Sequence, residues 1–312
     1  MVHIVRLPLP LVMLVVAMSI PATVAAVQAQ TSKLVAANTQ TAAPAKAATT
    51  AATGLEENAV STTNSKAPAA LSTAGAATAS PPCRAPAELA RLGQPLTHTA
   101  RLLAGGLPVK IIAIGSSSTA GAGASSPAAS YPSRLAIELR EKFPGHEFTV
   151  LNRGANGEEA RDMVARFETG ILAERPDLVL WQVGTNTVLR DHPLSPTSSL
   201  IEEGVARLKA AGADVILIDP QFAPKVIAKT DAEKMVDLLA IKAKQYNVNL
   251  FRRFAVMRHW RESQGIAFET FVSPDQLHMN DWSYACVAKI LSVAIAEAAT
   301  RPTASAAAQP AR

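Results

Sequence analysis

Four short polar segments of this 312-residue chain carry the side chains that could perform covalent chemistry. In chain order they are Gly-Ser-Ser-Ser at 115–118, Asn-Arg-Gly-Ala-Asn-Gly at 152–157, Gly-Thr-Asn at 184–186 and Asp-Gln-Leu-His at 275–278. A serine hydroxyl becomes a useful nucleophile when a neutral imidazole accepts its proton, and a carboxylate can hold that imidazole in the required tautomer. The residue types therefore predict Ser117 as nucleophile, His278 as general base and Asp275 as the partner that orients His278.

Each segment also has an explanation that involves no catalysis. Serines after a strand often form turns or cap helices, asparagine and glycine often mark turns, and Asp-x-x-His can be a surface ion pair where a helix begins. A phosphate-binding loop is disfavoured, because no lysine follows Gly121 and Gly123 and the third glycine of the dinucleotide fingerprint is missing. Only the combination of the four segments favours catalysis over these explanations.

Strands and helices alternate along the chain and supply the elements that would position the four segments. Apolar runs predict strands at 109–114, 147–151, 178–183, 214–218 and 248–251. Helices are predicted at 131–142, 158–167, 200–211, 231–245, 254–262 and 281–299, with Ser130 as the cap of the first and Asp281 or Ser283 as the cap of the last. The segment 87–103 has helical or mixed spacing. This alternation predicts an α/β fold, a three-layer α/β/α sandwich with a five-stranded parallel sheet, whose strand ends share one edge.

The four segments, in this order, resemble the conserved blocks of the SGNH hydrolases, the GDSL-type esterase and lipase superfamily. The residues of the first and last segments are similar to those of a secreted proteobacterial subgroup. The resemblance implies a flavodoxin-like fold and an oxyanion hole made of the Ser117 amide, the Gly157 amide and the Asn186 side chain. Two positions depart from the family pattern: Ser116 stands where the family has aspartate before the nucleophile, and Thr187 replaces the aspartate after the asparagine. Neither aspartate is the triad acid, so the chemistry can survive both changes.

The amino-terminal third of the chain predicts export. A basic residue, the short apolar run 11–20 and small residues up to 29 are typical of a cleaved signal peptide at 1–29, with an uncleaved membrane anchor as the alternative. The Ala/Thr/Ser-rich segment 30–81 predicts a disordered linker, 82–300 the hydrolase domain and 301–312 a disordered tail. We therefore expect a periplasmic or secreted protein without stable membrane insertion after cleavage.

The two cysteines, Cys83 and Cys286, could form a disulfide in an exported protein, and two buried thiols are the alternative. The net charge of +5 is spread along the chain, and no dense basic run with aromatic residues indicates nucleic-acid binding. No cluster of residues has metal-ligand spacing, so we expect neither a metal nor a cofactor.

Four residues at or near strand ends could line a substrate pocket: Trp181, Gln182, Gln221 and Phe222. Core packing explains the two aromatic residues at least as well. The function that we expect is hydrolysis of an acyl ester through an acyl-enzyme, with O-acetyl groups on envelope or extracellular carbohydrate as the first choice of substrate. The alternatives are acyl transfer to a sugar hydroxyl, hydrolysis of lipid or aryl esters, and a carbohydrate-binding module on the same fold. The expected partner is the ester substrate, and the sequence does not predict the oligomeric state.

Overall fold

The computed structural model describes residues 80–301. The predicted signal peptide at 1–29, the predicted linker as far as residue 79 and the predicted tail after residue 301 lie outside the described residues.

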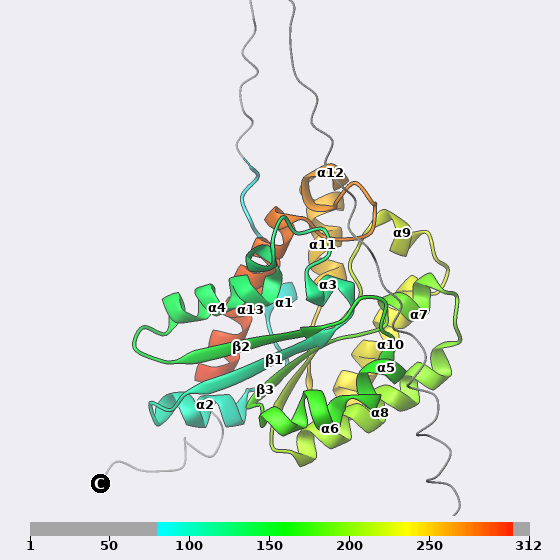
Figure 1. Ribbon diagram of the computed structural model, residues 1–312. Coiled ribbons are helices and arrows are strands. Elements are labelled where there is room, and N and C mark those ends of the chain that lie inside the picture. The colour runs from blue at the N-terminus through cyan, green and yellow to red at the C-terminus, as the bar shows by residue number, and fades with distance from the viewer. Residues whose placement is uncertain (1–79, 302–312) are drawn as a thin grey trace, which may run out of the picture. The chain divides into compact units, whose positions relative to one another are not determined.

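A parallel sheet of five strands forms the centre of this range, as the sequence predicts (Figure 1). The strands are β1 (Val109–Gly115), β2 (Phe148–Gly154), β3 (Leu178–Gln182), β4 (Asp214–Ile218) and β5 (Asn249–Phe251). Their order in the sheet is β2-β1-β3-β4-β5, and every neighbouring pair is parallel. Because β1, β3 and β4 lie side by side, their carboxyl ends bring residues that are about a hundred positions apart to one edge.

Helices cover both faces of the sheet, with α4 and α13 on one side and α6 and α8 on the other (Figure 1). The helices, with two short 3-10 turns marked η, are α1 (Ala87–Ala90), α2 (Thr97–Ala104), α3 (Ser117–Ala120), η2 (Pro127–Ala129), α4 (Tyr131–Lys142), α5 (Ala160–Ala165), α6 (Phe167–Gly170), η3 (Leu172–Glu174), α7 (Thr185–Leu189), α8 (Leu194–Ala210), α9 (Pro224–Ile227), α10 (Ala232–Gln245), α11 (Arg253–Glu262), α12 (Phe268–Phe271) and α13 (Asp281–Thr300). The three-layer α/β/α prediction is therefore confirmed.

The central strands are buried on both faces, which explains why their sequences are continuously apolar rather than alternating. All five residues of β3 are buried, including Trp181 at its end. The Trp181 ring meets Phe167 edge-on, and a side chain at Gly204 of α8 would lie 2.4 Å from the same ring. Trp181 and Phe222 therefore belong to the core, as the core-packing alternative predicts.

Four predicted elements differ from the structure. β2 continues to Gly154, because its polar last residues pair with β1 as far as Gly115. The helix predicted at 158–167 is two short helices, α5 and α6, and the segment 87–103 is also divided, into α1 and α2. α8 begins at Leu194 instead of residue 200, since Pro196 lies in its first turn, where no helical N–H partner is required.

The last helix, α13, is long and apolar enough to cross a membrane by length and composition, but most of it is buried inside the domain, as in the core helix of a globular protein. The predicted disulfide between Cys83 and Cys286 is present and joins the start of the domain to this helix. The same start is held by the Trp282 indole, which donates to the Pro81 carbonyl over 3.1 Å.

Candidate active site

The turn after β1 carries three consecutive serines with three different surroundings. β1 ends at Gly115, and Ser117 is the first residue of α3. The Ser117 hydroxyl lies 2.7 Å from Nε2 of His278. Ser116 and Ser118 are buried, and their hydroxyls contact other residues. Of the three hydroxyls, the one that the sequence predicts as nucleophile is thus the one beside the imidazole.

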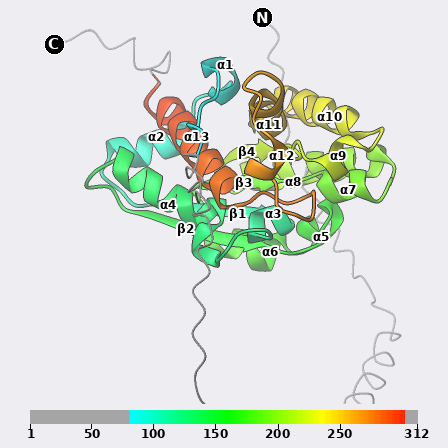
Figure 2. The ribbon, with the colours of Figure 1, turned by 90° about the horizontal axis from the view of Figure 1, so that it is seen from above.

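The segment before α13 forms a tight turn that presents the histidine. In Figure 2 this segment lies beside α3. Asp275 Oδ2 lies 2.5 Å from Nδ1 of His278, and Asp275 Oδ1 accepts hydrogen bonds of 2.9 Å from the backbone N–H groups of Leu277 and His278. The carboxylate therefore holds both the ring and the backbone that carries it.

The acidity of Asp275 follows from these contacts. Burial by itself would raise the pKa of this carboxyl, but hydrogen bonds from the His278 side chain and from the two backbone N–H groups hold the pKa below its usual range. An ionised carboxylate beside Nδ1 leaves Nε2 without a proton when the ring is neutral, because the ring proton then stays on Nδ1. The unprotonated nitrogen is the one that faces Ser117.

Residues around the turn fix its two ends. The Ser273 N–H donates to the His278 carbonyl over 2.8 Å, which closes the turn. Asn280 is the N-cap of α13 and shares a capping box with Ser283. The prediction of Asp281 or Ser283 as the N-cap is therefore wrong, because both residues lie inside the first turn of the helix. Asp281 instead accepts from the backbone and hydroxyl of Ser125, which joins the segment after α3 to α13.

Ser130 is the residue before α4, as predicted, but its side chain does not cap the helix backbone. Its hydroxyl donates over 2.7 Å to the carbonyl of Pro127 in the preceding turn. Ser130 thus occupies the predicted N-cap position, but its side chain makes no capping hydrogen bond to α4.

The segment after β2 carries the predicted oxyanion glycine. Gly157 has a φ of +78°, in the left-handed region that favours glycine. The Asn186 side-chain amide donates over 2.8 Å to the carbonyl of Glu158, the next residue. The Arg190 guanidinium donates over 2.9 Å to the Gly157 carbonyl itself. The structure thus brings Gly157 and Asn186 into one hydrogen-bonded loop.

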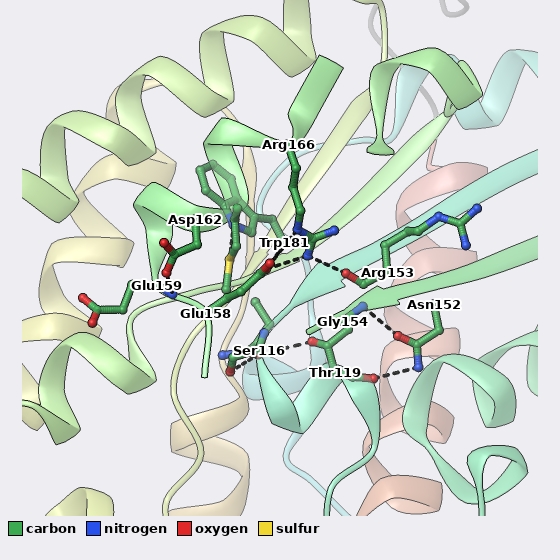
Figure 3. A network of polar contacts seen from close by, with 12 residues as sticks. Ser116, Thr119, Asn152, Arg153, Gly154, Glu158, Glu159, Asp162, Arg166 and Trp181 are labelled. Atoms are coloured by element: carbon green, nitrogen blue, oxygen red, sulfur yellow. Dashed lines mark hydrogen bonds and ion pairs between the residues drawn. The ribbon is translucent and has the colours of Figure 1, made fainter. Parts of the chain in front are cut away.

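A second set of contacts holds this loop and the end of β2 against α3 (Figure 3). Asn152 Nδ2 donates to the Thr119 carbonyl over 2.9 Å. Arg166 forms an ion pair with the Glu158 carboxylate and donates to the Arg153 carbonyl over 2.7 Å. A side chain at Gly154 would lie 2.2 Å from the Ala120 backbone nitrogen, so α3 can approach β2 only at a glycine. The sequence does not predict these supporting contacts, because an arginine carries no local signal of the distant carbonyl that it reaches.

The two glutamines that were expected to line a substrate pocket do not reach the surface. Gln182 and Gln221 are each 1% exposed. The Gln182 side-chain oxygen accepts hydrogen bonds from the backbone N–H and the hydroxyl of Ser116. The Gln221 amide donates to the Leu277 carbonyl. Both residues lie beneath the site and contact the segments that form it. The expectation that they line a substrate pocket is therefore wrong.

No group of His, Cys, Asp and Glu residues within 80–301 is arranged to hold a metal ion. The side chains that do meet are an alcohol, an imidazole and a carboxylate in one hydrogen-bonded row. Such a row can move a proton from the alcohol to the imidazole while the alcohol oxygen attacks a carbonyl carbon.

Known proteins with similar sequences or structures include several esterases. An arylesterase of Vibrio mimicus is 28% identical over 125 residues, which is 40% of this chain and 61% of that protein. An acetylxylan esterase of Geobacillus stearothermophilus is 36% identical over 56 residues, which is 18% of this chain and 26% of that protein. The chain thus spans less than two thirds of the length of these curated relatives.

A crystal structure of a two-domain esterase active on acetylated mannans, crystallised with mannopentaose, superposes with a TM-score of 0.59. The match has 21% sequence identity and covers 68% of this chain and 56% of that one, so it bears on the fold alone.

The model of the Non-GDSL lipase-like family matches residues 82–301 of this chain. This range contains all four polar segments and most of the chain. It agrees with the resemblance to SGNH hydrolases, while the narrower proteobacterial subgroup stays a prediction. The contacts among the four polar segments and the extent of the match together identify this chain as a member of the Non-GDSL lipase-like family, within the SGNH hydrolase superfamily.

Proposed function

We propose that this protein is a serine esterase that hydrolyses acyl esters through an acyl-enzyme. In this proposal Ser117 is the nucleophile, His278 the general base and Asp275 the residue that orients His278. The observation that carries the proposal is the distance of 2.7 Å from Ser117 Oγ to His278 Nε2, with Asp275 on the opposite ring nitrogen. Proton transfer needs such hydrogen-bond contact between the two groups.

The first half of the reaction transfers the acyl group to the enzyme. Ser117 Oγ bonds to the ester carbonyl carbon while its proton passes to His278 Nε2, and the carbonyl oxygen becomes an oxyanion. The bond from the carbon to the leaving alcohol then breaks, and the imidazolium returns the proton to that alcohol. Asp275 stabilises the imidazolium between these two transfers without accepting its proton.

The second half returns the enzyme to its starting state. A water molecule gives a proton to His278 and attacks the acyl carbon, and the Ser117 oxygen leaves with that proton. The oxyanion forms again at the same place. We assign the stabilisation of this oxyanion to the Ser117 N–H, the Gly157 N–H and the Asn186 side-chain amide, because preorganised hydrogen-bond donors stabilise the negative charge that develops in the transition state.

The substrate class that we favour is an O-acetylated carbohydrate. The relative named acetylxylan esterase, and the structure of an esterase active on acetylated mannans, support it. The arylesterase relative favours aryl esters as a second candidate.

We also propose that the protein works outside the cytoplasm, in the periplasm or secreted. The Cys83–Cys286 disulfide supports this, because such bonds persist in oxidising compartments.

The test of the nucleophile compares two neighbouring serines. Ser117→Ala should abolish both turnover of p-nitrophenyl acetate and the initial burst of p-nitrophenol, whereas Ser116→Ala should keep the burst. Normal activity of Ser117→Ala, with the variant folded by circular dichroism, would refute the proposed nucleophile. Loss of the burst only in Ser116→Ala would move the nucleophile by one residue.

The substrate is tested separately on the wild-type protein. Acetate release from acetylated xylan and mannan should exceed, in kcat/KM, the hydrolysis of p-nitrophenyl acetate and of longer acyl esters. A preference for aryl or long-chain esters would overturn the carbohydrate assignment and leave the esterase mechanism standing. Acetate that appears on an added sugar acceptor instead of in water would indicate acyl transfer.

A further inference from the structure

A cluster of buried polar side chains lies under the site and takes no part in the proposed reaction. Its members come from α3, β3 and its following helix, the segment after β4, and α11, and each is at most 3% exposed: Ser118, Gln182, Thr185, Gln221 and Arg253. Burying so many polar groups costs free energy unless each of them makes hydrogen bonds. The partners of these hydrogen bonds therefore fix how each side chain is oriented.

Gln221 has a fixed orientation within the cluster. Its side-chain oxygen accepts hydrogen bonds from Arg253 Nη2 over 3.0 Å and from the Thr185 hydroxyl over 3.2 Å. A guanidinium can only donate, so the amide oxygen must face Arg253 and the NH2 group must face the other way. That NH2 group donates to the Leu277 carbonyl over 3.2 Å.

The Leu277 carbonyl belongs to the peptide group that precedes the imidazole. The same peptide group ends in the His278 N–H, which donates to Asp275 Oδ1 over 2.9 Å. One peptide plane is thus held at its oxygen by Gln221 and at its nitrogen by Asp275. The direction in which the His278 side chain leaves the backbone follows from the orientation of this plane.

Arg253 connects this arrangement to the serine. The guanidinium is 0% exposed and donates to three acceptors, one on α3 and two on the segment after β4. Nε donates to the Asp219 carbonyl, Nη1 to the Ser118 hydroxyl and Nη2 to Gln221, each over 3.0 Å. Ser118 is the residue after Ser117, so one rigid, planar group reaches both the turn of the nucleophile and the glutamine that holds the turn of the base.

We propose that Gln221 and Arg253 are positioning residues that set the distance between Ser117 Oγ and His278 Nε2. Arg253 anchors the serine turn through Ser118, and Gln221 anchors the histidine turn through the Leu277 carbonyl. The inference rests on the proposed function of Ser117 and His278. It accounts for a buried guanidinium beneath a reaction that uses no positive charge there.

The test replaces one group of Gln221. Gln221→Glu keeps the shape and an oxygen towards Arg253, but puts an acceptor where the NH2 group faces the Leu277 carbonyl. Asn249→Asp is the matched control, because Asn249 is 3% exposed and its amide also donates to a backbone carbonyl, that of Gln94, at the start of β5. Both variants lose one buried amide donor, and only the first contacts the site.

The measurement is kcat per active site, with the active fraction taken from the burst amplitude. Misplacement of a reacting group by about 1 Å can cost roughly 10²-fold in rate, so we expect Gln221→Glu to lower kcat by about 10- to 100-fold with KM within about threefold of wild type. Asn249→Asp should keep the wild-type kcat per active site, although both variants lose thermal stability.

Three results would overturn the inference. The first is a Gln221→Glu protein with wild-type kcat per active site. The second is a loss of activity that the reduced active fraction accounts for entirely. The third is an equal loss of kcat in Asn249→Asp. If Gln221→Glu does not fold, Gln221→Met, which has similar length and no donor, gives the same test. Failure of the proposed function is recognised separately, by an active Ser117→Ala protein.

Discussion

At the scale of single residues, the environment of each hydroxyl separates one serine from its neighbours. The Ser116 hydroxyl donates to Gln182 and the Ser118 hydroxyl accepts from Arg253, whereas the Ser117 hydroxyl lies beside His278. Ser117 is half-buried, whereas Ser116 and Ser118 are buried. Three consecutive serines therefore have different partners: the outer two contact buried supporting residues, and the middle one, the proposed nucleophile, contacts the imidazole.

The carboxylate is tested by Asp275→Asn. An amide at this position cannot stabilise the imidazolium as a carboxylate does, so we expect kcat to fall by roughly 10²- to 10⁴-fold with little change in KM. Because hydrogen bonds lower the pKa of Asp275 in the folded protein, this group adds stability above its unfolded-state pKa of about 4. This stability is lost as the pH falls through the folded pKa, so urea unfolding of the variant should show a smaller loss of stability in acid. An unchanged kcat would contradict the role of Asp275.

At the scale of elements, the carboxyl ends of the strands provide the supports of the site. The end of β4 is tied to the start of α11 through Asp219, which is 0% exposed. One of its carboxylate oxygens accepts from the Phe254 N–H over 2.8 Å, and the other has no hydrogen-bond partner within residues 80–301. Burial raises the pKa of Asp219 to about 7, and the Phe254 N–H and the Arg253 charge offset only part of that effect.

The raised pKa of Asp219 predicts a pH dependence of stability. Between the unfolded-state pKa of about 4 and the folded-state pKa of about 7, the folded protein binds a proton that the unfolded chain has released. The contribution of Asp219 to the free energy of unfolding therefore decreases as the pH rises through this window and levels off above it.

Asp219→Asn keeps an oxygen for the Phe254 N–H and cannot titrate. Relative to wild type, the variant should gain stability as the pH rises from about 4 to 7, measured by urea unfolding at a series of pH values. A difference between the two proteins that stays constant with pH would show that Asp219 does not titrate in this range.

At the scale of the whole domain, its first and last segments are joined to each other. The Cys83–Cys286 bond links residues 203 positions apart. The Leu96 N–H donates to the Ala298 carbonyl over 3.1 Å, and Arg301 donates to the Leu92 carbonyl over 2.8 Å. Because α13 follows the turn that carries His278, these contacts also hold the helix from which that turn extends.

Removal of the disulfide tests this closure. Replacement of both cysteines by serine frees the unfolded chain from a long loop constraint, so the free energy of unfolding should fall by about 2–5 kcal/mol. The kcat per active site should stay near wild type, since the bond does not contact the site residues. Wild-type protein treated with reductant is the control and should behave like the double variant. Equal stability with and without the bond would contradict the prediction.

The patterns that the sequence determined by itself are local ones. Short apolar runs and helical spacing were enough for the five strands, for α4 over Tyr131–Lys142 and for the order of the layers. The spacing of Asp275 and His278 within one turn was enough to predict their contact, because three residues of tight turn leave the two side chains few other arrangements. The short segments that resemble the blocks of SGNH hydrolases are also local, and this resemblance supplied Ser117, Gly157 and Asn186 as candidates.

Only the tertiary structure decided which polar residues face the substrate and which support the site from below. Gln182 and Gln221 look like pocket residues from their place at strand ends, yet both are buried. Arg253 reaches Ser118 across 135 positions, and nothing near either residue in the chain indicates that contact. The physical reason is that a buried hydrogen bond between distant segments depends on how sheet and helices pack together, whereas periodicity and spacing describe only what neighbouring residues do.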